Sequence, residues 1–221
     1  MNTKLLAAAI ALGALLPVTR LDAQAWAYPS FQPPRVIVRE YNFGIADADG
    51  GGPSIVFQWR EQSGPKTQFS FDIGLADTEG RDSDIIVFGG IGIAHRLGDA
   101  TNEVPLDFLL TAGLYLAIWD NALFRLPLGV SLGHRFDLGG GMSLTPYVHP
   151  RLSIDICNDC GGNDSDIGLV FDLGANFQLS RSVSIRGAAV FAGDDTFGGE
   201  GFGISLAWTP PSLARRVGFG R

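Results

Sequence analysis

Apolar and polar side chains alternate along most of this chain, and the clearest example lies at residues 67–77. The large apolar residues there are Phe69, Phe71, Ile73 and Leu75, and the residues between them are polar or small. A period of two places the apolar residues on one face of an extended strand, whereas a helix would spread them around its circumference. The pattern recurs about ten times and predicts an all-β fold.

The predicted strands are separated by segments rich in Gly, Pro, Asp and Ser. They span residues 36–47, 54–62, 67–77, 84–96, 104–118, 122–136, 142–156, 166–179, 183–192 and 200–209. Each is long enough to cross a bilayer, since a membrane β-strand needs about 9–11 residues. We expect ten strands, and eight is the alternative if the first and last pair are misread.

The two faces of these strands differ in chemistry. One face is bulky and nearly uncharged, and the other carries glycines and charges of both signs. We predict a lumen charge network made of Glu40, Arg60, Asp72, Arg96, Asp107, Arg125, Arg135, Arg151, Asp155, Asp172 and Arg186. Lipid excludes charges, whereas opposite charges can pair across a narrow lumen. The fold class is therefore an up-and-down antiparallel transmembrane β-barrel. The alternative is a soluble barrel whose apolar face points inward.

Two groups of residues depart from the pattern. Apolar residues also occur on the polar face, at Ile86, Phe88 and Leu109. Prolines fall inside predicted strands, at Pro127, Pro146 and Pro150. A proline removes one hydrogen bond from the ladder, so we expect bulges or interfacial positions at these three sites.

The N-terminus has the features of a secretory signal peptide. A lysine at position 4 precedes an apolar run from Leu5 to Val18, and Ala23-Gln24-Ala25 is a typical cleavage site. The run is too short to span a membrane as a helix. We expect residues 1–25 to be the signal peptide, 26–35 a periplasmic leader, 36–209 the barrel and 210–221 a periplasmic tail. Cleavage after Ala27 is the alternative.

Charge and cysteine content narrow the chemistry. The net charge of −7 disfavours nucleic acid as a partner, because binding of phosphates needs basic patches. The two cysteines, Cys157 and Cys160, are predicted to form a disulfide in an oxidising compartment. A redox motif would need a βαβ context and a zinc site would need further ligands, and neither is present.

Acidic residues gather in the segments at the presumed outer end of the barrel. They are Asp47, Asp49, Asp77, Glu79, Asp82, Asp84, Asp120, Asp159, Asp164, Asp166, Asp194, Asp195 and Glu200. The ordinary interpretation is a set of solvated loops. We expect no cofactor, and weak binding of divalent cations at these loops is a hypothesis that calorimetric titration can test.

The last predicted strand reads Gly201-Phe-Gly-Ile-Ser-Leu-Ala-Trp208. Gly203, Leu206 and Trp208 resemble the terminal assembly signal of outer-membrane barrels, although the tail after Thr209 departs from it. The pattern over 36–209 resembles the small opacity-type, eight-to-ten-stranded outer-membrane proteins. This resemblance implies a bacterial outer membrane with both termini periplasmic. It implies outer-membrane lipids, lipopolysaccharide and the assembly machinery as partners.

No catalytic residue is predicted. The histidines are His95, His134 and His149. The lipid A deacylases of this size class use a His-x-Ser pair, but the second residue after each of these histidines is not a serine. An open channel needs about 16 strands, so we expect a lumen largely filled by side chains. The predicted role is structural or surface interaction, without enzyme activity. The alternatives are a narrow passive pore for small solutes and, less favoured, a lipid-modifying enzyme.

Overall fold

The structure is a computed structural model that describes residues 28–48, 52–77, 85–158, 165–193 and 199–211. The predicted signal peptide and most of the C-terminal tail lie outside these residues. The described part of the chain contains no helix that is long and apolar enough to cross a membrane.

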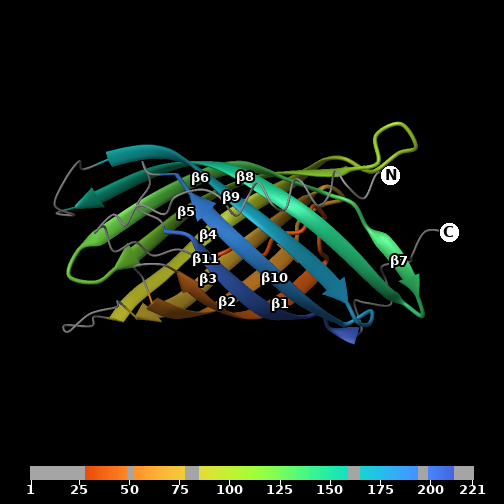
Figure 1. Cartoon of the computed structure of the whole chain (residues 1–221), viewed down its shortest axis with the longest axis horizontal. Helices are drawn as coiled ribbons and strands as arrows, with labels where there is room; N and C mark the ends of the chain where they lie inside the picture. The colour runs from red at the N-terminus through yellow and green to blue at the C-terminus, as the bar shows by residue number, and fades with distance from the viewer. Residues whose placement is uncertain (1–27, 49–51, 78–84, 159–164, 194–198, 212–221) are drawn as a thin grey trace, which may run out of the picture.

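Ten long antiparallel strands close into a barrel (Figure 1). In chain order the ten barrel strands and the short additional strand β7 are β1 (Arg39–Ala48), β2 (Gly52–Gln62), β3 (Thr67–Asp77), β4 (Ile85–Gly98), β5 (Asp107–Ile118), β6 (Ala122–Gly133), β7 (Phe136–Gly139), β8 (Met142–Asn158), β9 (Ser165–Gln178), β10 (Val183–Ala192) and β11 (Gly201–Trp208). Sequential neighbours pair, β6 pairs with β8, and β1 pairs with β11 to close the cylinder. The predicted ten-stranded barrel is confirmed over the eight-stranded alternative.

The short strand β7 is an addition to the barrel. It pairs only with the start of β8 and forms a hairpin at one end of the cylinder (Figure 1). The turn contains Gly139, Gly140 and Gly141, whose φ angles of 83°, 62° and 85° are left-handed. Glycine adopts this conformation without steric cost, so the chain reverses here. The predicted strand 122–136 is divided between β6, which ends at Gly133, and β7, which begins at Phe136.

The charged and small residues face the lumen and the bulky apolar residues face outward. Phe43 is 58% exposed and Ile85 68%, whereas Glu40 is 2% and Arg186 0% exposed. The three apolar residues on the polar face of the strands also point into the barrel, since Ile86, Phe88 and Leu109 are all at most 1% exposed. The predicted orientation of the faces is thus confirmed.

We call the end where β1 begins and β11 ends the proximal end, and the opposite end the distal end. The lumen near the distal end is apolar, where the side chains of Val56, Ala76, Ile86, Phe88, Ala117 and Leu123 pack together. The lumen between this apolar layer and the proximal end is polar and charged. The barrel is therefore filled by a layered core.

The three prolines do not lie at bulges, so of the two expectations for them only the interfacial position stays open. The pairing of β6 with β8 keeps one register on both sides of Pro150, from Gly129 opposite Arg151 to Leu132 opposite Val148. Pro127 and Pro146 are also paired in unshifted registers. The strands tolerate the lost hydrogen bond because neighbouring pairs hold the register. Within the described strands, the register shifts lie between Arg96 and Gly98 and between Asp137 and Gly139.

Candidate functional site: the occupied lumen

Residues 28–38, which we call the N-terminal segment, run inside the barrel before the chain enters β1. Pro29, Phe31, Gln32, Pro33 and Pro34 are buried. The sequence predicts residues 26–35 as a periplasmic leader, but residues 28–35 contact the lumen wall instead. An alternation pattern reports only on strands, so a segment that fills the lumen without pairing carries no such signal.

Side chains of the wall hold the backbone of the N-terminal segment. Arg60 Nη2 donates to the carbonyl of Ser30 at 2.8 Å, and Ser131 Oγ donates to the carbonyl of Gln32 at 2.7 Å. The Ser30 N–H donates to Asp172 Oδ2 at 3.0 Å, and the Ile37 N–H donates to Gln68 at 2.8 Å. The bonds of Ser131 and Gln68 are buried and those of Ser30 are partly buried, and leaving a buried group of this kind unpaired costs about 1–3 kcal/mol.

Phe31 is the deepest apolar anchor of the segment. A Cβ on Gly203 would lie 2.7 Å from Phe31 Cζ, and one on Gly44 would lie 3.1 Å from Phe31 Cε2. These two glycines of neighbouring strands thus form a socket in which the ring is fully buried. The Phe31 φ of 48° is left-handed, which a non-glycine residue adopts only when its surroundings hold it there.

Arg35 of the N-terminal segment lies near the proximal end of the barrel. Its Nη1 donates to Gln178 Oε1 at 3.1 Å. Burial, followed by the nearby Arg186, lowers the pKa of Arg35 to about 10. The guanidinium therefore stays charged at neutral pH.

One charge cluster is centred on Glu40. Arg186 donates to both carboxylate oxygens at 2.6 Å, and Arg60 donates to Oε1 at 3.1 Å. Arg186 also donates to Asn176 at 2.8 Å and to the Phe31 carbonyl at 3.3 Å. A buried carboxylate with two cations and further hydrogen bonds is compensated, although removal of one partner would leave a buried charge.

A second cluster is centred on Asp172. Arg151 donates to its Oδ1 and the Ser30 hydroxyl to its Oδ2, both at 2.5 Å. His149 Nδ1 lies 2.8 Å from Ser30 Oγ, and its Nε2 lies 2.8 Å from Thr111 Oγ1. Because the single Ser30 proton goes to Asp172, the His149 ring donates from Nδ1 to Ser30.

The remaining lumen charges form smaller contacts. Arg125 pairs with Asp155 through bonds of 2.9 and 2.8 Å. Asp72 accepts from the Tyr28 hydroxyl and from Gln58, both at 2.8 Å, and forms no ion pair with another described residue. Tyr28 also stacks on Phe88 with ring centroids 5.1 Å apart, which ties the segment to the apolar layer.

Three members of the predicted lumen charge network lie at the proximal rim. Arg96 pairs with Asp99 at 3.1 Å, and Arg135 pairs with the exposed Asp137 at 3.0 Å. Asp107 accepts from the Ala100 N–H at 2.8 Å. These residues lie at the ends of strands, so they reach the turns rather than the lumen.

The other predicted residues are dispersed. His95 contacts Thr67 on the exposed surface at 3.0 Å, and His134 meets Phe136 edge-on at 4.7 Å. Of the terminal assembly signal, Gly203 faces Phe31, while Leu206 and Trp208 are 50% and 43% exposed on the outside. Cys157 is buried at the distal end of β8. Cys160 lies outside the described residues, and the disulfide stays a prediction.

The space left in the lumen is small. A cavity of about 50 Å³ is lined by Ser30, Asp72, Thr111, His149 and Arg151, among others. A second, of about 20 Å³, lies beside Tyr28 and Arg125. Such volumes hold a few water molecules. Among the described residues, no group of three or more His, Cys, Asp or Glu side chains could hold a metal ion.

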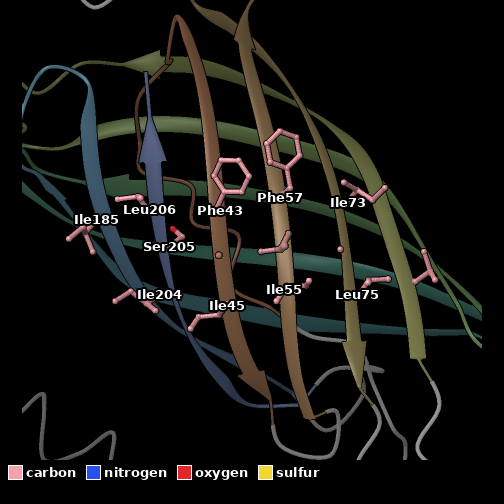
Figure 2. A pocket seen from close by; sticks show the side chains of 14 residues that line it. Phe43, Ile45, Ile55, Phe57, Ile73, Leu75, Ile185, Ile204, Ser205 and Leu206 are labelled. Carbon is pink, nitrogen blue, oxygen red and sulfur yellow. The ribbon is translucent and has the colours of Figure 1, made fainter. Parts of the chain in front are cut away.

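The outer wall is apolar where β11, β1, β2 and β3 lie side by side. Figure 2 shows the side chains of Phe43, Ile45, Ile55, Phe57 and Ile73 arranged over these strands, where they line a shallow groove. Near the proximal end an aromatic band follows, in which Tyr41 stacks on Trp208 at 5.7 Å. Arg39 and Glu61 form an ion pair where β1 begins, in which Arg39 Nη2 donates to Glu61 Oε1 at 2.6 Å.

No known protein family and no curated protein matches the sequence. The fold is similar to that of the β domain of the Bordetella autotransporter BrkA, with a TM-score of 0.52 at 13% identity over 77% of this chain and 83% of that one. Weaker similarities are to LpxR from Salmonella typhimurium, with a TM-score of 0.49 at 7% identity over 77% of this chain and 100% of that one, and to a KdgM porin, with a TM-score of 0.42 at 6% identity over 77% and 99%. The chain thus has the fold of an outer-membrane β-barrel.

Proposed function

We propose that the protein is an integral outer-membrane barrel that does not conduct solutes and that serves a structural or surface-interaction role. The observation that carries this proposal is the filled lumen, in which the N-terminal segment packs against buried wall residues. Phe31, Asp172 and Arg186 are all 0% exposed. A solute would have to displace this packing to cross.

The outer membrane is the location that fits the outside of the barrel. A wall of exposed Phe, Ile and Leu side chains would be costly in water but suits lipid, and an aromatic band is typical of the membrane interface. We further propose that the proximal end, with both ends of the barrel chain, faces the periplasm. Outer-membrane lipids, lipopolysaccharide and the assembly machinery are the proposed partners.

We also propose that the protein is not an enzyme. Thr111 Oγ1 lies 2.8 Å from His149 Nε2, and His149 Nδ1 lies 3.6 Å from Asp172 Oδ2. A hydroxyl, an imidazole and a carboxylate follow one another in the same order in a catalytic triad. Ser30 lies between the ring and the carboxylate, however, and the adjoining cavity of about 50 Å³ has no room for a lipid. The cluster is better suited to holding the N-terminal segment.

Planar-bilayer recording of the purified full-length protein tests the proposal. We expect no steady conductance from protein whose heat-modifiable gel migration shows that it is folded. A steady, small conductance would favour the narrow-pore alternative and contradict the filled lumen. Fractionation of the protein with periplasmic contents, with no shift on heating, would contradict the membrane location.

The acidic distal segments are proposed to bind divalent cations weakly. Asp47, Asp77, Asp120, Asp166 and Glu200 are described, and the other acidic residues of these segments lie outside the described residues. Calorimetric titration with calcium, using magnesium and sodium as controls, is the test. No heat above that of dilution would remove the proposal.

A further inference from the structure

The wall binds side chains of the N-terminal segment, namely Tyr28, Ser30, Gln32 and Arg35, and it also binds the backbone of the segment. At the junction with β1, the carbonyl of Val38 accepts from the Gln62 N–H at 2.9 Å. The more deeply inserted residues are held by side chains of the wall instead. The wall residues that bond backbone groups of the segment are Gln58, Arg60, Gln68, Ser131, Asp172 and Arg186. Six side chains from the five strands β2, β3, β6, β9 and β10 converge on peptide groups of the segment and form a binding site for a peptide.

Specificity comes from Phe31. Its ring fills the socket formed by Gly44 and Gly203, where any larger residue would clash. Its left-handed backbone costs about 1–2 kcal/mol, which the surrounding contacts must offset. Such a conformation points to a segment that is bound into place by the wall rather than one that follows its own preference.

Three buried ion pairs of the wall do not involve the segment. Arg186 with Glu40, Arg151 with Asp172, and Arg125 with Asp155 are contacts within the wall. The strand pairing that closes the cylinder likewise involves only β-strands. Withdrawal of the segment would therefore expose polar groups to water without leaving a lone buried charge in these pairs.

We propose that the lumen wall is a binding site for a peptide, occupied by residues 28–38 of the same chain and able to exchange that occupant for a second copy of the segment. The site recognises main-chain groups through the six wall residues and one aromatic side chain through the glycine socket. Covalent linkage to β1 raises the local concentration of the occupant but is not required for recognition. This inference goes beyond the proposed function and does not depend on whether the barrel conducts.

The first experiment places a reporter thiol on the segment of the full-length protein, through Pro29→Cys. Reaction with a charged thiol reagent is followed by mass spectrometry of the peptide that carries it. We expect labelling to be slow, and to speed up about tenfold or more when Phe31→Ala or Gly203→Ala loosens the socket, since tenfold corresponds to about 1.4 kcal/mol.

The matched control is Gly187→Ala on β10, where a Cβ would meet nothing closer than Phe202 Cζ at 4.0 Å. We expect this variant to label at the parent rate. Fast labelling of the thiol with the wall unchanged would overturn the proposal, because the segment would not occupy the lumen. Equal rates for all variants would overturn it as well, because the socket would not hold the segment.

The second experiment supplies the occupant separately. A fluorescent synthetic peptide of residues 28–38 is added to the folded full-length protein that carries both Pro29→Cys and Phe31→Ala, whose own segment lacks the anchor. We expect saturable binding that speeds up labelling of the introduced thiol, and binding about tenfold weaker or less for a peptide that carries Phe31→Ala. No binding to the folded protein would overturn the proposal.

A refolding experiment with the same peptides tests the proposal if the Phe31→Ala protein does not fold by itself. Refolding is then repeated with the wild-type peptide present and read by heat-modifiable migration. Recovery of the folded band with the wild-type peptide, but not with the Phe31→Ala peptide, supports a separable site. Failure of both peptides to restore folding would overturn it.

Discussion

Arg186 on β10 and Glu40 on β1 meet inside the barrel across the intervening strand β11, through two hydrogen bonds of 2.6 Å. Neither side chain is more than 2% exposed. The two residues are 146 positions apart in the chain. Their contact therefore ties the first strand to one of the last ones on the lumen side of the seam where the cylinder closes.

Loss of this pair is expected to weaken the barrel strongly. Glu40→Ala leaves the Arg186 and Arg60 guanidinium groups buried without their carboxylate, which costs about 3–5 kcal/mol. Urea unfolding in lipid vesicles, followed by tryptophan fluorescence, measures the free energy of unfolding. The control is Glu61→Ala at the exposed pair with Arg39, which should change stability much less. Equal effects of the two variants would contradict the buried cluster.

Gly74 supports the apolar layer by leaving room for Phe88. A Cβ at position 74 would lie 2.3 Å from Phe88 Cζ and 2.4 Å from the Ile55 carbonyl oxygen. We expect Gly74→Ala to destabilise the barrel by about 1–3 kcal/mol, because the ring must move and the backbone contact remains. Gly187→Ala serves as the control, measured by the same unfolding assay. An unchanged midpoint for Gly74→Ala would show that this part of the lumen is loosely packed.

The outward face is tested by a charge in the middle of β3. Ile73 is 47% exposed on the outer wall. In lipid, Ile73→Arg should cost about 2–4 kcal/mol, and Ile85→Arg at the distal start of β4 about 0–1 kcal/mol. The comparison is made by unfolding in vesicles of phospholipid. If Ile73→Arg folded as stably as the wild-type protein, the wall would not face lipid.

Tyr28 connects the N-terminal segment to Asp72. Tyr28→Phe removes the donor to Asp72 Oδ2 and leaves Gln58 as the donor to that oxygen, which should cost about 1–3 kcal/mol. Tyr41→Phe, on the outer aromatic band, should stay within about 0.5 kcal/mol. Both are measured as unfolding free energies. A neutral Tyr28→Phe would argue that the segment contributes little to the folded barrel.

The sequence by itself determined the course of the barrel strands and which of their faces points outward, but it left ten and eight strands as alternatives and did not reveal the short strand β7. Alternation is a local property with a period of two, and a barrel in lipid must place its uncharged face outward. The apolar residues Ile86, Phe88 and Leu109 could be located on the inner face from their parity alone. What their side chains meet there could not be predicted from parity.

Only the tertiary structure decided how the lumen is filled. The pairing of Glu40 with Arg186 rather than with another arginine depends on the tilt and stagger of the strands, which are properties of the whole cylinder. The place of Phe31 depends on glycines from two strands that meet only when the barrel closes. A segment without periodicity shows no pattern to predict from, so its position is set by the space and the polar groups that the closed wall leaves for it.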